Sequence, residues 1–313
     1  MLEQNQNCCE VINKAKALGC RCLEGEMLKE HVSFKVGGRC RCLVSINSAS
    51  SVAELVLMCE NIGVPYIVIG KGSNLLIDDN GYDGIVFLMG KDFSSVSLLN
   101  ETTIECEAGA PLSKVAYFAY KNGLSGFEFS WGIPGTVGGA VYMNAGAYGG
   151  EVQDVIVNAE YVKKDGGIGI FEKDELDLSY RHSIFQSGEY VITKAVFKLE
   201  KGEPAVIRAR MDELMKRRKD KQPLEFPSAG STFKRPDGTF ASLLIEQCGL
   251  KGLSVGGAEV STKHSGFVIN KNNASYCDVI SLINKVKEIV HEQTGYSLEC
   301  EVEIISSESG KEA

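Results

Sequence analysis

Hydrophobic residues recur with a helical period in several parts of this 313-residue chain. Apolar residues three and four positions apart predict a helix that opens with Ser51 and Glu54 as a capping box and ends at Gly63. The same spacing predicts a helix over 278–294, with a buried stripe made of Val279, Leu282, Ile283, Val286 and Val290. A proline at position 111 suits the start of a further helix that runs to position 123.

Short apolar runs between these helices predict strands. Two of them flank a Lys-Asp-Gly-Gly turn and therefore predict a hairpin. In the last run, apolar residues occupy one face while Glu299, Glu301 and Glu303 occupy the other. The expected strands cover 64–69, 85–89, 103–107, 155–163, 168–171, 190–199, 266–270 and 298–305.

Helices and strands succeed one another without a regular βαβ order, which predicts an α+β fold with mixed sheets. The linker Lys201-Gly202-Glu203-Pro204 separates the last part of the chain and is followed by a basic helix. We expect an N-terminal leader and helix, two α+β subdomains, a C-terminal α+β domain and a polar tail, with the boundaries 1–30, 31–92, 93–202, 203–305 and 306–313.

The composition, 44% hydrophobic and 24% charged, excludes a disordered chain. A net charge of −8 argues against a general binder of nucleic acid or of acidic membranes, because such proteins carry an excess of positive charge. The N-terminus is polar, and no uninterrupted apolar run is long enough to cross a bilayer. We therefore expect a soluble, cytoplasmic protein without an export signal or membrane insertion.

Eleven cysteines, an odd number, favour reduced thiols in the cytoplasm over a disulfide scaffold. Two C-x-C pairs, Cys20 with Cys22 and Cys40 with Cys42, offer four thiolates to a zinc ion, although this spacing is not the usual one for zinc. In a strand, residues two apart share a face, so the pairs also suit small apolar residues of a sheet. We expect no metal.

Two glycine-rich segments are the main candidates for ligand binding. GKGSN at 70–74 follows an apolar run and can form a nest of backbone N–H groups around an anion, with an ordinary tight turn as the alternative. Residues 131–151 contain seven glycines with interleaved apolar residues, which suits a shell around a large planar ligand better than a flexible linker. Neither segment has the P-loop or the Rossmann spacing.

Four polar features add candidate chemistry. Arg181 beside Tyr180 can clamp a carboxylate or phosphate, although an ordinary surface arginine fits as well. The helix segment 208–221 carries a local excess of positive charge that suits a diphosphate. Ser231 follows a glycine in a loop without a nucleophile motif, so a proton donor is a better interpretation than a hydrolase nucleophile. Any of the three glutamates near the C-terminus can face a site.

Six segments in order, GKGSNLL, GIPGTVGGAVYMNAGAYGGE, YRHSIF, KQPLEFPSAGSTFKRP, GGAEVSTKHSGFVIN and EVEII, resemble the UDP-N-acetylenolpyruvoylglucosamine reductase family in its shorter form. The resemblance covers about 31–305. It implies a fold of the vanillyl-alcohol-oxidase type with non-covalent FAD, NADPH as hydride donor and UDP-N-acetylglucosamine enolpyruvate as substrate. It also implies hydride delivery from flavin N5 to C3 of the enol ether. We expect a monomer with small-molecule partners.

The resemblance assigns catalysis to Arg181, Ser231 and Glu301, with the serine as proton donor to C2 and the other two acting on the enolate. It implies substrate contacts from Tyr180, Arg218, Lys221 and Lys234. It implies cofactor contacts from Gly70, Lys71, Gly72, Ser73, Asn74, Leu75, Gly135, Thr136, Gly138, Gly139, Ala140, Asn144 and Gly146.

The chain departs from the family pattern at two places. Ser242 and Leu243 stand where Gly and Lys are common, which puts one phosphate or ribose contact in question, and Glu303 stands where Arg is frequent. Two other classes remain as alternatives. A sugar or alcohol oxidase on the same scaffold would not need the serine and glutamate motifs, and a non-catalytic nucleotide-binding module would need only the glycine loops.

Overall fold

The computed structural model describes residues 2–306 and 310–312. The chain divides into two compact units that exchange segments along the sequence. The first consists of Met1–Glu24, Arg41–Lys71 and Gly84–Arg217, and the second of Gly25–Cys40, Gly72–Asp83 and Arg218–Ala313. The linear domain boundaries expected from the sequence stay a prediction.

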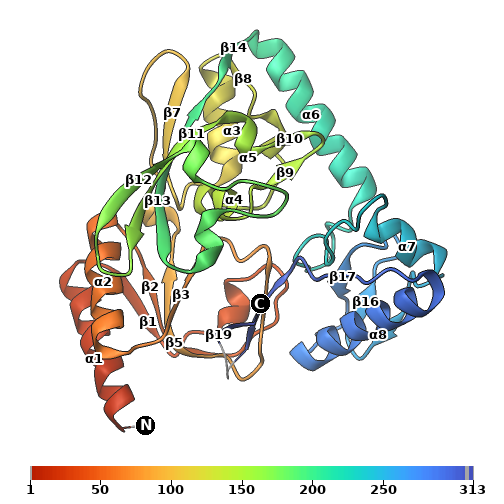
Figure 1. The fold of residues 1–313 in the computed structure, drawn as a ribbon, viewed down its shortest axis with the longest axis horizontal. Helices are drawn as coiled ribbons and strands as arrows, with labels where there is room; N and C mark the ends of the chain where they lie inside the picture. Colours follow the sequence, from red (N-terminus) through yellow and green to blue (C-terminus); the bar gives the residue numbers. More distant parts are fainter. Residues whose placement is uncertain (1, 307–309, 313) are drawn as a thin grey trace. The chain divides into compact units, whose positions relative to one another are not determined.

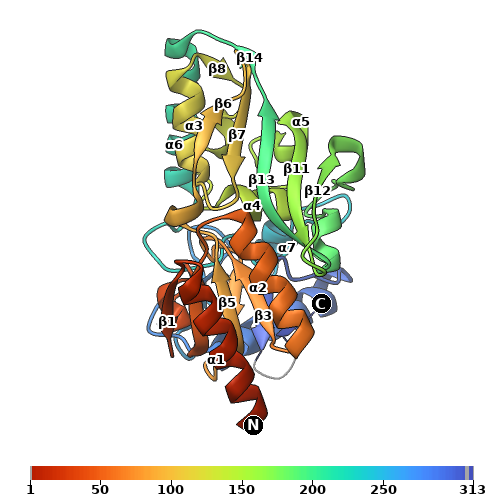
Figure 2. The same cartoon turned by 90° about the vertical axis from the view of Figure 1, so that its left-hand side faces the viewer.

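The first unit begins with a four-stranded sheet in the order β1-β2-β5-β3, and helices α1 and α2 lie side by side on it (Figure 2). Its elements are α1 (Leu2–Ala17), β1 (Arg21–Glu24), β2 (Cys40–Ser45), α2 (Ala49–Ile62), β3 (Tyr66–Ile69) and β5 (Tyr82–Leu88). The predicted buried face of α2 and its end at Gly63 are confirmed. The predicted start was wrong by three residues, because Ser48 lies one turn earlier and its Oγ accepts the N–H of Ser51 at 3.1 Å.

A five-stranded antiparallel sheet in the order β12-β11-β13-β7-β6 completes the first unit (Figure 1). The predicted hairpin over 155–171 and the helix that follows Pro111 are confirmed. The elements are β6 (Val96–Leu98), β7 (Thr103–Glu107), α3 (Leu112–Lys121), β8 (Leu124–Ser125), α4 (Val137–Tyr142), β9 (Gly146–Ala147), β10 (Gly150–Glu151), α5 (Val152–Val155), β11 (Ile156–Lys163), β12 (Ile168–Glu172), β13 (Tyr190–Lys198) and β14 (Glu200–Lys201). Helix α6 (Pro204–Lys221) follows the predicted linker.

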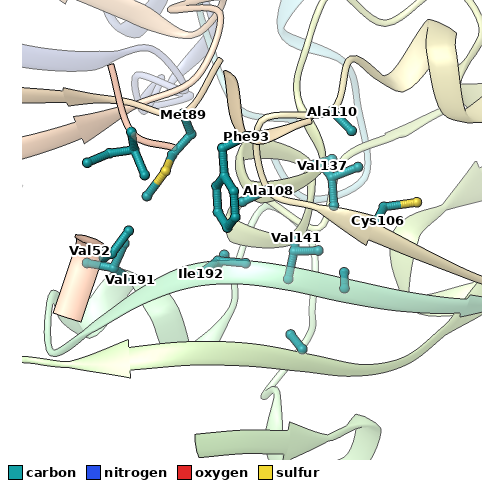
Figure 3. Close-up of a cluster of buried hydrophobic side chains, with 14 of the residues drawn as sticks. Val52, Met89, Phe93, Cys106, Ala108, Ala110, Val137, Val141, Val191 and Ile192 are labelled. Atoms are coloured by element: carbon teal, nitrogen blue, oxygen red, sulfur yellow. The ribbon is translucent and has the colours of Figure 1, made fainter. Parts of the chain in front are cut away.

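One hydrophobic core joins the four-stranded and five-stranded sheets of the first unit. In Figure 3, Phe93 lies between Met89 at the end of the first sheet and Ala108 beside the second. Val141 of α4 and Ile192 of β13 belong to the same buried cluster. Helix α4, which carries part of the second glycine-rich segment, is therefore held firmly against the five-stranded sheet.

Within the described residues, the second unit contains two three-stranded sheets, two complete α-helices, the short 3-10 helix Leu28–Glu30 and the end of α6. Helix α8 begins at a capping box of Ser275 and Asp278, and its predicted stripe of five apolar residues is buried. The elements are β4 (Leu75–Ile77), α7 (Ala241–Gln247), β15 (Ser254–Val255), β16 (Ala258–Val260), β17 (Val268–Asn270), α8 (Tyr276–Thr294), β18 (Glu303–Ser306) and β19 (Gly310–Glu312).

The predicted strand over 298–305 was wrong in its first half, since β18 starts only at Glu303. Upstream, Cys300 forms an isolated antiparallel bridge with Phe233, whereas β18 pairs in parallel with β4. Because the chain changes partner between these two pairings, no single ladder spans the segment. The predicted polar tail contains β19, which pairs with β18; residues 307–309 and 313 lie outside the described residues.

The cysteine pairs lie in strands or next to them. Cys22 belongs to β1, and Cys40 and Cys42 belong to β2. Burial raises the pKa of Cys40 to about 11 and that of Cys59 to about 12, so these groups are thiols at neutral pH. Across residues 2–306 and 310–312, no three His, Cys, Asp or Glu side chains gather in an arrangement that would hold a metal ion.

Among the described helices, none combines the length and the apolar character needed to cross a bilayer.

Candidate active site

The first glycine loop packs against the cap of α4. Thr136, which is 3% exposed, is the N-cap residue of α4, and its Oγ1 accepts the N–H of Gly139 at 3.5 Å. A Cβ placed on Gly70 would collide with Thr136 Oγ1 and would lie 3.2 Å from its Cγ2. Glycine at position 70 therefore allows the loop to approach the start of α4.

The start of α4 is fixed by a second close approach. The N–H of Gly138 donates to Ala108 O at 2.8 Å, and a Cβ on Gly138 would lie 3.1 Å from the Cβ of Ala108. By contrast, a Cβ on Gly139 would meet nothing closer than Thr136 Oγ1 at 3.7 Å. Of the predicted cofactor residues in this segment, Gly138 packs α4 against Ala108, whereas Gly139 leaves the surface of α4 open.

The side chain of Asn144 makes hydrogen bonds to other groups of the protein. It is fully buried in a left-handed backbone conformation, with φ of 39°. Its Nδ2 donates to Ser179 O at 3.0 Å and to Glu151 Oε2 at 3.2 Å, while its Oδ1 accepts the N–H of Gln153 at 2.9 Å. The predicted cofactor contact of Asn144 stays a prediction, and both N–H groups of its amide already donate to the protein.

Tyr180 and Arg181 form the tip of a tight turn. Ser179 and His182 exchange two backbone hydrogen bonds, at 3.3 and 3.1 Å, and Arg181 has φ of 56°. The Arg181 guanidinium lies 4.9 Å from the centre of the Tyr180 ring. Since Asn144 binds Ser179 O, the end of α4 and this turn are held together. His182 pairs with Asp177 Oδ2 at 3.0 Å, which agrees with a hydrogen-bonding role.

Gly70 and Lys71 belong to the first unit, whereas Gly72, Ser73 and Asn74 belong to the second. Gly72 has φ of 56°, and a Cβ there would lie 2.5 Å from His31 O and 2.8 Å from Val32 Cα. Lys71 is exposed, and neither its ammonium nor the Ser73 hydroxyl makes a hydrogen bond or ion pair within the described residues. These two polar groups are therefore available to a ligand.

Ser231 follows Gly230, whose φ of 81° favours glycine. The next residue, Thr232, is fully buried and is bonded by its N–H to Gly266 O at 2.8 Å. In the part of the chain that the structure describes, the Ser231 hydroxyl makes no hydrogen bond. A firmly held backbone thus presents a hydroxyl that is free to bond with a substrate.

Glu301 lies beside this loop. Its N–H donates to Thr232 O at 2.8 Å, so the segments of Ser231 and Glu301 are joined directly. Asn74 of the GKGSN loop donates from Nδ2 to Glu301 O at 2.9 Å. Three candidate residues that are far apart in the sequence are thereby brought together in the second unit, whereas Arg181 belongs to the first.

The predicted substrate residues of the second unit differ in their surroundings. Lys234 Nζ pairs with Glu299 Oε2 at 3.5 Å, whereas exposed Lys221 makes no hydrogen bond or ion pair among the described residues. Arg218 lies one turn before Lys221 on α6. Leu243, one of the departures from the family pattern, is 47% exposed.

Sequence reasoning missed Ser33. Its Oγ donates to Ser228 O at 2.6 Å, and its N–H donates to Gly72 O at 3.0 Å, so it ties the GKGSN loop to the loop that carries Ser231. Serine is a common hydrogen-bonding residue of loops, but the distant partners of Ser33 could not be read from spacing.

These residues fit a flavin dinucleotide. Gly70 allows its loop to pack on the side chain of Thr136, Gly138 allows α4 to pack on Ala108, and Gly139 leaves the surface of α4 open. In the first unit, the exposed Lys71 ammonium, which has no ion pair within the described residues, would suit a diphosphate. The GKGSN loop and α4 are the segments that would hold the cofactor.

Comparisons with known proteins agree with this fit. An FAD binding domain family matches residues 40–170, and the C-terminal domain of UDP-N-acetylenolpyruvoylglucosamine reductase matches residues 222–305. The reductase of Clostridium novyi is 49% identical over 288 residues, which cover 90% of this chain and 92% of that protein. The reductase of Clostridium botulinum strain Hall is 46% identical over 284 residues, which cover 91% and 92% of the two chains.

A solved structure agrees as well. The reductase of Thermus caldophilus superimposes with a TM-score of 0.77 at 34% identity and covers 91% of this chain and 98% of its own. The α+β fold with an FAD-binding domain, expected from the sequence, is confirmed. The chain belongs to the UDP-N-acetylenolpyruvoylglucosamine reductase family and is an FAD-dependent oxidoreductase.

Proposed function

We propose that the chain reduces UDP-N-acetylglucosamine enolpyruvate to UDP-N-acetylmuramate, with NADPH as the electron donor, in the cytoplasmic synthesis of peptidoglycan precursors. The observation that carries the proposal is the direct bond from Glu301 N–H to Thr232 O, which joins the predicted proton donor and the predicted glutamate. When bound, the flavin accepts hydride from NADPH and supplies it to the substrate double bond.

Ser231 donates a proton to C2 of the reduced enolpyruvyl group. Its hydroxyl is not engaged by any described residue, and the backbone on both sides is fixed by Gly230 and Thr232. A serine hydroxyl is a weak acid, so the transfer needs a basic acceptor, and the developing carbanion at C2 is strongly basic.

Arg181 and Glu301 act on the enolate that develops beside the substrate carboxylate. The planar guanidinium of Arg181, which is half-buried and lies 4.9 Å from the centre of the Tyr180 ring, offers parallel N–H donors to a carboxylate. Glu301, held by its backbone, either donates a proton to the enolate or orients the Ser231 hydroxyl.

The remaining predicted residues bind either the cofactor or the substrate. Lys71 and Ser73, with the glycines of the loop and of α4, bind the cofactor. Lys221, Arg218 and Lys234 bind the diphosphate and sugar of the substrate, and Tyr180 contributes beside Arg181. The protein acts as a monomer on these small molecules.

The test is an anaerobic absorbance experiment on the holoenzyme and on Ser231→Ala. NADPH should bleach the flavin of both proteins at similar rates. Recovery of the colour on adding UDP-N-acetylglucosamine enolpyruvate should slow by roughly 10²- to 10⁴-fold in the variant, because only this half-reaction needs the proton. Ser228→Ala is the matched control, since it removes a hydroxyl from the same loop and keeps the backbone carbonyl that Ser33 uses.

Equal losses in both half-reactions of Ser231→Ala would contradict the proton-donor role. Flavin that recovers only with oxygen would favour an oxidase instead. Protein that cannot bind FAD would leave a nucleotide-binding module.

A further inference from the structure

Glu301 lies at the point where the C-terminal segment changes its partner. Before it, the N–H of Lys234 donates to Glu299 O at 2.9 Å, and Glu301 N–H donates to Thr232 O at 2.8 Å. After it, Glu303 pairs with Leu75 in the parallel ladder of β18 and β4. A ladder that ends and another that begins leave the carbonyl between them without a regular strand partner.

Asn74 supplies the missing partner. Its Nδ2 donates to Glu301 O at 2.9 Å, and its own backbone O accepts the N–H of Glu303 at 2.9 Å. These two bonds from one residue hold the backbone on both sides of Val302, which is itself buried. The direction of the Glu301 carbonyl fixes its ψ angle, and the backbone angles decide which side-chain rotamers are allowed.

We propose that Asn74 is a positioning residue for Glu301, in addition to any contact it makes with the cofactor. The inference rests on the proposed function, in which Glu301 acts on the enolate. It gives the GKGSN loop a second role, because the loop that receives the cofactor also sets the direction of a catalytic carboxyl group. Gly72 supports the loop from the other side through its close approach to His31 and Val32.

The test is a double-mutant cycle on the FAD-loaded enzyme with Asn74→Ala and Glu301→Gln. Asn74→Ala should slow the oxidative half-reaction by about tenfold, the upper part of the range for one lost hydrogen bond. Glu301→Gln should slow the same step by about a hundredfold. In the Glu301→Gln background, Asn74→Ala should change the rate by less than about twofold, since its effect passes through that carboxyl group.

Ser73→Ala is the matched control for damage to the cofactor loop. Any effect it has should multiply with that of Glu301→Gln, because its hydroxyl makes no bond to the C-terminal segment. Asn74→Ser is a second variant for the case in which the alanine variant loses its flavin, because serine suits the turn but is too short to reach Glu301 O.

Amide hydrogen exchange gives a readout that does not depend on turnover. Both Asn74 variants should raise exchange over residues 300–304 by about tenfold, and Ser73→Ala should not. Equal slowing by Asn74→Ala in both backgrounds, or exchange that does not change, would overturn the inference. If Glu301→Gln alone has no effect on the oxidative half-reaction, the proposed role of Glu301 fails instead.

Discussion

Alanine at position 70 would force Thr136 to move. The new Cβ would collide with Thr136 Oγ1 and would stand 3.2 and 3.3 Å from its Cγ2 and Cβ. Thr136 is 3% exposed and caps α4 through Gly139, so it has little room to rotate. Gly70 is not among the glycines with left-handed backbone, so the expected penalty comes from packing and not from torsional strain.

The size of the stability loss follows from two effects on Thr136, the loss of its N-cap hydrogen bond and the overpacking of its side chain. Loss of an N-cap costs about 1 kcal/mol, and overpacking of a buried site adds about 1–3 kcal/mol. Gly70→Ala should therefore lower the free energy of unfolding by about 2–4 kcal/mol. Thr136→Ala alone should cost about 1 kcal/mol. The double variant should cost little more than Thr136→Ala, because the atoms that collide are then absent.

Urea unfolding followed by circular dichroism checks the cycle, on flavin-free and on FAD-loaded protein. A packing loss appears in both forms, whereas a loss of cofactor contacts appears only in the loaded form. Gly139→Ala is the control, because its Cβ would lie 3.7 Å from Thr136 Oγ1 and alanine favours a helix by up to about 1 kcal/mol. Additive losses in the double variant, or a cost of Gly70→Ala below about 0.5 kcal/mol, would refute the reasoning.

Two further predictions concern charge. Arg181→Lys should slow the oxidative half-reaction by about 10- to 100-fold without moving the urea midpoint, because lysine lacks the planar guanidinium that can form two parallel hydrogen bonds with a carboxylate. An unchanged rate would contradict a catalytic role for Arg181. Burial lowers the pKa of His264 below its usual 6.5. As the pH falls, His264 is therefore protonated at a higher pH in the unfolded state than in the folded state, and the free energy of unfolding should decline below about pH 6.5. His264→Asn keeps an acceptor for the N–H of Gly266 and should flatten that decline in urea titrations at several pH values; the same slope in both proteins would contradict it.

Elements with local signals could be predicted from the sequence. Helix α8 has five apolar residues at helical spacing between a capping box and Gly295, and each of these features acts within a few residues. The β11–β12 hairpin likewise depends on a turn of four residues. The start of α2 was misplaced for a local reason too, since Ser48 and Ser51 have the same capping chemistry and only the geometry selects between them.

Pairings between distant segments could not be predicted in this way. Residues 25–40 and 72–83 belong to the same unit as the last ninety-six residues of the chain (218–313), and the spacing of their apolar and polar residues does not indicate this. Glu299, Glu301 and Glu303 follow one another with the same period, so periodicity cannot choose among them. What distinguishes Glu301 is the change of strand partner beside it, which depends on Thr232 and Asn74.

Ser231 and Thr232 show why neighbouring hydroxyl groups of the same chemistry take different roles. Thr232 is fully buried, its Oγ1 accepts the N–H of Val268 at 3.0 Å, and its backbone binds Gly266 and Glu301. The Ser231 hydroxyl, by contrast, makes no hydrogen bond within the described residues. With Ser231 as the proposed proton donor, a change at Thr232 should slow the reaction through the direction of Ser231 and Glu301 and not through a substrate contact of its own.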